Sequence, residues 1–376
     1  MKSFEIYKAY GTDFRTMTER LLEKAGLEEE LSQKARALGR GREDLRITVK
    51  PNLVAPTPAD YGATTHTEIV EGILEFLRAG GWQAVTIAEG SWVGDSTADA
   101  FEYCGYNALS RKYGVPLVDN QKAASFRADC AGMELSLCEC VRDTDFLINV
   151  PVLKGHCQTK MTCALKNLKG LIPNAEKRRF HKLGLHGPIA HLNAGIRQDF
   201  IVVDHVCGDP DFEEGGNPLV RNCVMAAKDP VLTDAYAAAL LGYRPEEIGY
   251  VTLAEKLGVG SADLGSLRTV TVEGENTEDI PETRRILEVN YAVDAVDSCS
   301  ACYGALIGAL IKLKDRGYSL DDLDGKVCIG QGYRGRSGCF GVGACTAGFE
   351  ESVPGCPPEE DAILEALLGR LSRKDA

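Results

Sequence analysis

The sequence predicts an α/β protein with a mostly parallel sheet, flanking helices and a C-terminal cysteine-rich α/β module. Short apolar runs alternate with amphipathic helical segments through the first three quarters of the chain, a pattern typical of parallel sheets covered by helices. Several of these runs end in polar residues, as expected of strands that open into a binding site. Six of the 14 cysteines lie between positions 299 and 356, which indicates a separate module there.

The first strand and the first helix of this pattern are predicted over residues 46–50 and 65–79. The helix has Thr65 and Glu68 at the spacing of a capping box, and it is expected to stop at Gly80. Its apolar positions recur at helical spacing: Ile69, Val70, Ile73, Leu74 and Leu77. This apolar face predicts packing against the sheet.

Further apolar runs are predicted to be strands, over residues 84–90, 115–119, 146–150 and 200–204. A helix is expected over residues 98–113. Asp229 followed by Pro230 is expected to open another helix, which ends near Gly242. A charged, turn-rich patch over residues 273–285 then precedes the cysteines. We therefore expect two domains, residues 1–275 and a cysteine module over residues 286–376.

The cysteine module is expected to end in a helix. Pro357 and Pro358 precede three acidic residues, and proline followed by acidic residues is typical of a helix start. Apolar residues then recur with the helical period: Ile363, Leu364, Leu367, Leu368 and Leu371. Cys356 is thereby placed near the positive end of a helix, which favours an anionic cluster.

The charge of the chain is unevenly distributed. The net charge is −13, which argues against nonspecific nucleic-acid binding, because such binding requires neutralisation of phosphates. Residues 151–182 nevertheless carry eight basic residues and one acid, so this basic segment is +7. A solvated helix face normally mixes both signs. The basic segment therefore predicts an anion site.

The amino-terminal residues and the hydropathy indicate a cytoplasmic protein. The opening residues contain no secretory signal, and no apolar run approaches the roughly 18 residues that span a membrane. A disulfide framework is not expected in that compartment. The expected partners are a small anionic substrate or a redox partner protein, with no nucleic acid and no membrane, and a homodimer is left open.

Polar residues beyond the carboxyl ends of the predicted strands form the candidate substrate site, because open parallel sheets bind ligands there. The expected substrate-binding residues, for a carboxylate or a phosphate, are Lys50, Asn52, Lys166, Asn167 and Lys169. His156, Lys154 and Glu89 are the expected catalytic groups, with His156 or Glu89 handling protons. Gly170 is expected to cap a short helix that carries part of the set. Taken one at a time, each of these residues could be an ordinary loop residue.

The late cysteines predict a [4Fe–4S] cluster. Cys299 and Cys302 form a Cys-x-x-Cys pair, and Cys356 stands directly before proline, a recurrent position for the last ligand of such a cluster. The glycine-rich run around Cys345 can bend around a cluster. We therefore assign Cys299, Cys302, Cys345 and Cys356 as the cofactor and metal ligands. A structural zinc ion and scattered buried thiols are the alternatives.

Two further cysteines are reserves for this ligand set, Cys328 and Cys339. Cys328 lies in an apolar strand-like run, where a cysteine more often serves as a small buried hydrophobe. Arg334 and Arg336, on the neighbouring glycine-rich loop, are expected to extend the anion site. His156, His181 and His186 could surround a second metal ion.

Five segments resemble the DUF362 family, a group of uncharacterised proteins often linked to iron–sulfur clusters. They read, in order, KPNL (50–53), NVPVLKGH (149–156), ALKNLKG (164–170), FH (180–181) and DPVLTD (229–234). Many relatives carry a ferredoxin-like insert, which this chain lacks. Its Cys-x-x-Cys, Gly-x-Cys-Thr and terminal Gly-Cys-Pro-Pro instead resemble a subset of the family, and the last element is similar to the cluster-binding end of hydrogenase and complex I small subunits. The resemblance implies the fold and the cluster but no settled reaction.

The leading functional hypothesis is an iron–sulfur oxidoreductase that acts on a small anion. A second hypothesis is Lewis-acid chemistry, an isomerase or lyase reaction assisted by a cluster iron or a histidine-bound metal. A third is an electron carrier or cluster carrier without catalysis of its own, in which the basic residues dock an acidic partner. A pocket lined by the lysines would favour an enzyme, and a flat exposed patch would favour a carrier.

Overall fold

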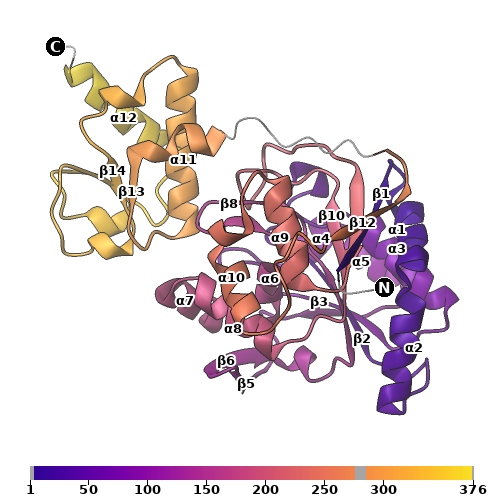
Figure 1. Ribbon diagram of the computed structural model, residues 1–376. Helices are drawn as coiled ribbons and strands as arrows, with labels where there is room; N and C mark the ends of the chain where they lie inside the picture. Colours follow the sequence, from indigo (N-terminus) through magenta and orange to yellow (C-terminus); the bar gives the residue numbers. More distant parts are fainter. Residues whose placement is uncertain (1–3, 276–284, 375–376) are drawn as a thin grey trace. The chain divides into compact units, whose positions relative to one another are not determined.

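The computed structural model describes residues 4–275 and 285–374. Its internal contacts divide the chain into two compact units, which Figure 1 shows. The first, here called the body, comprises residues 1–155 and 161–280, and the second comprises residues 156–160 and 281–376. Most of the predicted separator, residues 273–285, lies outside the described residues. Each unit is described by itself.

The body is built on an eight-stranded sheet with the spatial order β12-β1-β11-β10-β7-β2-β3-β4. In chain order its strands are β1 (Glu5–Tyr10), β2 (Ile47–Pro51), β3 (Val85–Glu89), β4 (Leu117–Asp119), β7 (Phe146–Val150), β10 (Phe200–His205), β11 (Cys223–Ala227) and β12 (Arg268–Glu273). β11 pairs antiparallel with β1 and with β10, whereas the other neighbours pair in parallel. The predicted mostly parallel sheet is thus confirmed, and β1, β11 and β12 extend it beyond the predicted strands.

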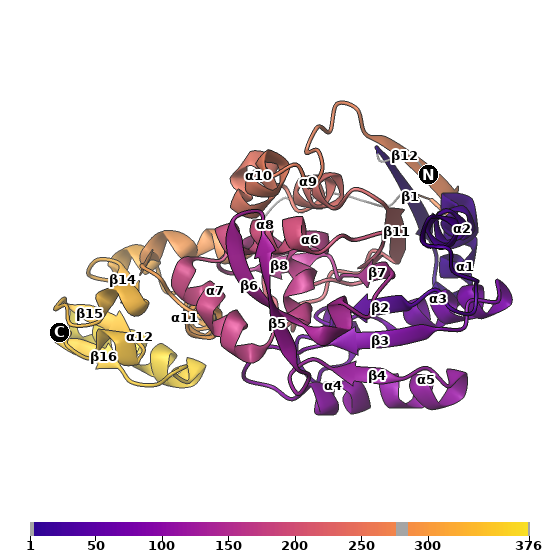
Figure 2. The same cartoon turned by 90° about the horizontal axis from the view of Figure 1, so that it is seen from below.

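Both faces of the sheet are buried. Successive side chains of each strand point to opposite faces, so one strand can contribute to two apolar clusters. In β7, Phe146 and Ile148 contribute to one apolar cluster and Leu147 to the other. Figure 2 shows α1 (Phe14–Ala25), α2 (Leu27–Leu38), α3 (Thr67–Ala79) and α5 (Tyr106–Tyr113) on one side. On the other side it shows α6 (Ala164–Asn167), α8 (His186–Gly195), α9 (Pro230–Leu240) and α10 (Gly249–Lys256). This double cover explains the near-continuous apolar runs of the strands.

Three local predictions about helices can be compared with the structure. Asp229 caps α9 as expected, since its side chain accepts from the amides of Val231 and Leu232. The expected helix over residues 98–113 is instead two helices, α4 (Thr97–Tyr103) and α5, because Gly105 between them has φ +79°. The capping box at the start of α3 was wrong: Thr65 Oγ1 donates to the carbonyl of Val150 and accepts from the amide of Asn52.

Smaller elements lie outside the two main sheets. β5 (Ser125–Cys130) and β6 (Met133–Cys138) form an antiparallel hairpin, and β8 (Lys154–His156) pairs with β9 (Lys160–Thr162). The basic segment continues through α6 into a single 3₁₀ turn, Leu168–Leu171, and then into α7 (Asn174–Leu183). Gly170 therefore lies inside the 3₁₀ turn rather than capping a helix.

The second unit has its own four-stranded parallel sheet, in the order β13-β14-β15-β16. Its strands are β13 (Val293–Ala295), β14 (Val327–Ile329), β15 (Phe340–Val342) and β16 (Glu351–Val353). Two helices accompany them, α11 (Ser300–Asp315) and α12 (Glu360–Lys374). The α12 residues Ile363, Leu364, Leu367 and Leu371 are buried, in agreement with the predicted apolar stripe.

Candidate functional site

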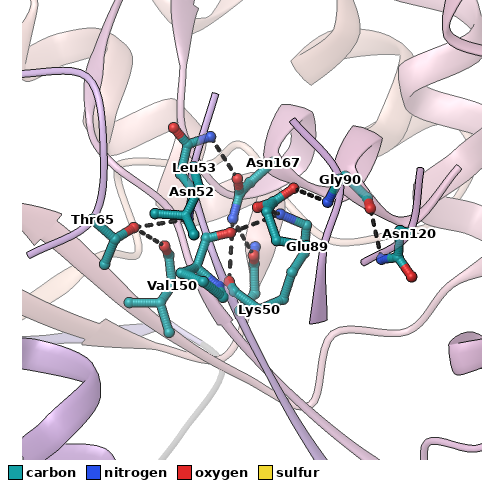
Figure 3. A network of polar contacts seen from close by, with 12 residues as sticks. Lys50, Asn52, Leu53, Thr65, Glu89, Gly90, Asn120, Val150 and Asn167 are labelled. Atoms are coloured by element: carbon teal, nitrogen blue, oxygen red, sulfur yellow. Dashed lines mark hydrogen bonds and ion pairs between the residues drawn. The ribbon is translucent and has the colours of Figure 1, made fainter. Parts of the chain in front are cut away.

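Lys50 and Glu89 lie at the carboxyl ends of the adjacent strands β2 and β3, where they bind each other (Figure 3). Lys50 Nζ is 2.6 Å from Glu89 Oε2, and the side chains are 0% and 3% exposed. Lys50 also donates to the carbonyl of Pro51, while Glu89 Oε1 accepts from the amide of Gly90. Burial lowers the pKa of Lys50, and Glu89 opposes this shift. Lys50, the expected substrate-binding residue, and Glu89, the expected proton-transfer group, therefore neutralise each other inside the protein.

Asn52, Asn149 and Asn167 form a buried amide chain next to this pair. Asn52 Nδ2 donates to Asn167 Oδ1 at 2.8 Å, and Asn167 Nδ2 donates to Asn149 Oδ1 at 2.7 Å. Asn167 is 3% exposed and Asn149 is fully buried, so these bonds satisfy groups that would otherwise be costly to bury. Figure 3 shows Asn167 beside the ends of the strands. The predicted substrate-binding residues Asn52 and Asn167 thus connect the basic segment to the sheet.

The ammonium group of Lys154 is also bound by acceptors within the protein. Its ammonium donates to Asn52 Oδ1 and to the backbone carbonyls of Ala63 and Glu213, and the side chain is 1% exposed. Burial, and then the charge of Lys166, lower the pKa of Lys154 to about 7. A lysine with three internal acceptors is a structural crosslink, so the predicted catalytic role of Lys154 is not supported by its geometry.

The 3₁₀ turn of the basic segment lies directly against the Lys50–Glu89 pair. A Cβ atom added at Gly170 would overlap Glu89 Oε1 and would lie 2.8 Å from Lys50 Cε. The carbonyl of Gly170 accepts from Asn120 Nδ2 at 2.8 Å, which ties the turn to the end of β4. Glycine is therefore required at position 170, because the turn packs directly against the Lys50–Glu89 pair. This packing also fixes the position of Lys169, the preceding residue.

Lys166, Lys169 and His181 are neighbouring groups of the basic segment, and Lys166 Nζ donates to Thr162 Oγ1 at 3.1 Å. Lys169 is half-buried and has no hydrogen-bond acceptor within residues 4–275 and 285–374. Burial lowers its pKa well below the usual lysine value, and the charges of Lys166 and Lys177 lower it further. The Nδ1 atom of His181 is buried and has no partner in the described chain. We call these three residues the anion site, because two lysine side chains beside an unpaired histidine nitrogen suit a bound anion.

Electrostatics at the anion site are dominated by mutual repulsion. Burial and the charges of Lys169 and Lys166 lower the pKa of His181 to about 3, and only Glu213 opposes them to a notable degree. His181 is therefore neutral, and it can donate or accept one hydrogen bond to a ligand. An anion placed here would raise the pKa of Lys169 and of His181 and relieve the repulsion.

The other two histidines proposed for a second metal have different surroundings. His186 Nδ1 accepts from the amide of Tyr250 at 3.1 Å, and the two rings stack. His156 is 4% exposed, and its Nδ1 accepts from the amides of Gln158 and Thr159 within the segment 156–160. Neither His181 nor His186 belongs to any group of three metal-ligating side chains in the described chain. The expected three-histidine metal site is therefore not formed.

Sequence reasoning overlooked a group centred on His66, the residue before α3. His66 Nδ1 donates to Asp204 Oδ2 at 2.8 Å, and its Nε2 faces Asp60 Oδ1 at 3.4 Å and Cys207 Sγ at 3.7 Å. Burial lowers the pKa of His66, but Asp204 outweighs this effect and raises it to about 11. A polar sequence, Thr64-Thr65-His66, shortly after β2 was the available signal. Two of its partners could not be identified because they lie 138 and 141 positions away in the chain.

In the second unit, the four assigned cysteines come close around the start of α11. Cys299 is the residue before the helix, Cys302 lies in its first turn, and their sulfurs are 3.3 Å apart. The hydrogen bond with Cys302 lowers the pKa of Cys299 to about 6. The same bond raises the pKa of Cys302, as do burial and the negative charges of Cys299, Cys356 and Cys345. Residues distant in sequence are thus brought within electrostatic range of one another.

Two expectations about the surrounding loops change in the structure. Arg334 Nε donates to Cys345 Sγ at 3.4 Å, so Arg334 serves the cysteine group rather than the anion site for which it was predicted. Cys328 lies in β14 between the buried residues Val327 and Ile329, but its own side chain is partly exposed because alternate strand residues face opposite ways. Its electrostatic neighbours are Tyr333, Asp294 and Cys339, not the assigned four.

Residues 47–239 match the family described as Domain of unknown function (DUF362). A thylakoid-associated protein from Synechocystis sp. is 24% identical over 226 residues, which cover 57% of this chain and 68% of that protein. The solved lactate racemase apoprotein from Thermoanaerobacterium thermosaccharolyticum aligns with a TM-score of 0.38 and 12% identity, over 59% of this chain and 54% of that one. None of the described helices combines the length and apolar character needed to cross a membrane. The family match spans more than half of the sequence, and the chain belongs to the DUF362 family.

Proposed function

We propose that this protein is an iron–sulfur oxidoreductase that acts on a small anionic substrate. In this proposal Cys299, Cys302, Cys345 and Cys356 hold a [4Fe–4S] cluster. The observation that carries it is that the three segments bearing these cysteines meet at the N-terminus of α11: Ala344 N donates to the carbonyl of Gly355 at 2.8 Å, and Gly343 lies beside Cys302 Sγ. A bound cluster of this kind would supply one-electron transfer.

The surroundings of the four cysteines fit an anionic cluster. The first-turn amides of α11 and the guanidinium of Arg334 place positive charge beside the thiolates. At Gly343 an added Cβ would lie 3.8 Å from Cys302 Sγ, so the glycine leaves room beside the sulfur. These features stabilise thiolates, the form that binds iron.

The spacing of the four sulfurs does not match a preformed zinc site. A single tetrahedral zinc ion with thiolate ligands holds every pair of sulfurs about 3.8 Å apart. No three of the four sulfurs lie mutually within 4.8 Å in the described chain, although Cys299 and Cys302 are only 3.3 Å apart. A cube of four irons holds its ligand sulfurs farther apart than one ion does, so Cys299 and Cys302 would have to separate when a cluster binds.

The substrate class follows from the anion site. Lys166 and Lys169 would bind a carboxylate or phosphate by charge-assisted hydrogen bonds, and His181 would add one neutral hydrogen bond. Lys50, Lys154, Asn52 and Asn167 would position this group without contacting the substrate, because their polar atoms are engaged with the protein. The half-buried position of Lys169 keeps one ammonium accessible to a small ligand.

The cluster is tested by anaerobic purification with iron and sulfide analysis and EPR of the reduced protein. The wild type should contain about four irons and four sulfides per chain. Cys356→Ala should lose this content and the visible absorption, while the matched variant Cys328→Ala should keep both. Full iron content in Cys356→Ala, or zinc in place of iron in the wild type, would contradict the assignment.

The anion site is tested by calorimetric titration of the full chain with sulfate and with succinate. Lys169→Gln should weaken binding at least tenfold, because one charge-assisted bond contributes about 1.5–3 kcal/mol. Lys182→Gln is the matched control, since Lys182 is an exposed lysine of the same basic segment and the change in net charge is identical. Equal loss in both variants would indicate only long-range attraction. A protein that holds the cluster but binds neither anion would be better described as an electron carrier.

A further inference from the structure

We propose that Asp60, His66 and Cys207 form a second metal site, for a zinc-like divalent ion, in the body of the protein. The site is independent of the proposed cluster and of the anion site. His66 supplies Nε2, Cys207 supplies Sγ and Asp60 supplies a carboxylate oxygen, and all three atoms lie within 4.8 Å of one another.

The distances are those of a tetrahedral site before the ion enters. A zinc ion with ordinary bonds to nitrogen, oxygen and sulfur sets its ligand atoms about 3.4–3.8 Å apart. Nε2 of His66 is 3.4 Å from Asp60 Oδ1 and 3.7 Å from Cys207 Sγ. The ion therefore requires little movement of the side chains, and it would displace the proton on Nε2 of His66 when it binds.

Three elements of the fold set this geometry. Asp60 lies in the 3₁₀ turn Ala59–Tyr61, His66 immediately precedes α3, and Cys207 follows the carboxyl end of β10. The 3₁₀ turn is attached to the loop after β10, because the amide of Asp209 donates to the carbonyl of Gly62 and the amide of Gly216 to that of Tyr61. The backbone segments that carry Asp60 and Cys207 are thereby joined by hydrogen bonds.

Asp204 provides the outer support that metal-binding histidines normally have. A carboxylate that accepts from the far nitrogen of the imidazole fixes the ring and directs the other nitrogen at the ion. Asp204 Oδ2 accepts from both Nδ1 and the backbone amide of His66 at 2.8 Å, and Oδ1 accepts from the amide of Val206 at 3.0 Å. Nε2 is thus oriented toward Asp60 and Cys207. The ring of Phe14 packs edge-on against His66 and limits its rotation.

The ligand set identifies the class of ion. One thiolate and one imidazole favour zinc or cobalt over magnesium or calcium, which prefer oxygen ligands. Three protein ligands leave one tetrahedral position open, as in sites whose ion binds water or a substrate oxygen. Asp60 is 96% exposed, so this position is accessible from solvent, whereas His66 and Cys207 are buried.

The test is anaerobic titration of chelator-treated full-length protein with Co²⁺, followed by its thiolate charge-transfer absorption. The wild type should bind one ion more than Cys207→Ser or His66→Ala, whatever the cysteine module binds, because the two variants leave that module unchanged. Asp204→Asn should weaken this site about 10- to 100-fold. Cys104→Ser is the matched control, since Cys104 is another buried cysteine of the body and lies outside the group.

Asp60→Asn keeps the test decisive if a buried variant does not fold, because the Asp60 side chain is exposed. It should fold normally and bind the ion at least tenfold more weakly. Bound Zn²⁺ should also slow alkylation of Cys207 by iodoacetamide. Equal Co²⁺ content and affinity in the wild type, Cys207→Ser and Asp60→Asn would overturn the proposal. So would rapid, His66-dependent alkylation that Zn²⁺ does not slow, which would identify Cys207 as a nucleophilic thiol instead.

Discussion

Replacement of Glu89 by glutamine is expected to destabilise the body strongly. The change removes the charge that compensates Lys50, whose side chain is fully buried and whose ammonium is 2.6 Å from Glu89 Oε2. Removal of one partner from a buried pair costs about 3–5 kcal/mol, because an uncompensated charge remains inside the protein. Domains of this size have total stabilities of about 5–15 kcal/mol, so the loss would be easily measured.

Urea unfolding followed by tryptophan fluorescence measures this loss in the body alone. The chain has two tryptophans, Trp82 and Trp92, and both lie in the body. The double variant Lys50→Met with Glu89→Gln should recover much of the stability, since it removes both charges. Glu134→Gln is the control, because Glu134 pairs with Arg127 at the surface, where such pairs contribute at most about 1 kcal/mol. A cost below about 1 kcal/mol for Glu89→Gln would refute the structural role of the pair.

The cost of Glu89→Gln should also depend on pH. Burial lowers the pKa of Lys50 and Glu89 raises it, so the pKa falls further when Glu89 is neutralised. Between that lowered pKa and the unfolded value of about 10.4, the unfolded chain binds more protons than the folded one, so the stability of the variant rises with pH. The cost should therefore be smaller at about pH 9.5 than at about pH 7. A pH-independent cost would mean that Lys50 is not the group left uncompensated.

The remaining predictions concern single contacts. Gly170→Ala should lower the free energy of unfolding by about 1–3 kcal/mol, because the added methyl group overlaps Glu89. Gly187→Ala, in α8 with open space around it, should be neutral or stabilising, and similar values for both variants in urea unfolding would contradict the close approach. Asp229→Ala should cost about 1–2 kcal/mol because α9 loses its N-cap, and an unchanged unfolding midpoint would show that the cap is dispensable. Sulfate affinity should fall as pH rises through the lowered pKa of Lys169, because the bound anion favours the ammonium form of the lysine. Calorimetry should detect proton uptake when sulfate binds. An affinity that does not change with pH would exclude Lys169 from the site.

Local sequence pattern was sufficient for the elements that pack within the body. The apolar stripe correctly predicted helix α3 and its buried face, since Ile69, Ile73 and Leu77 are all fully buried. The residues at the ends of β2 and β3 were correctly placed at one edge of the sheet, because parallel strands share their carboxyl ends. Spacing also selected the pair Cys299 and Cys302, whose sulfurs are 3.3 Å apart. These inferences succeed because helical and strand periods are properties of neighbouring residues.

Which of those residues face a ligand was decided by the tertiary structure alone. Lys50 and Lys169 look alike in sequence, yet the first is neutralised by Glu89 from the next strand and the second has no acceptor in the described chain. The partners of His66 lie elsewhere in the sequence, Asp204 at a separation of 138 residues. Composition and periodicity determined the layers, the basic segment and the cysteine set. The pairing of buried charges depends on long-range packing. Burial sets the free-energy cost of leaving a charge unpaired, and the fold determines which partner lies within reach.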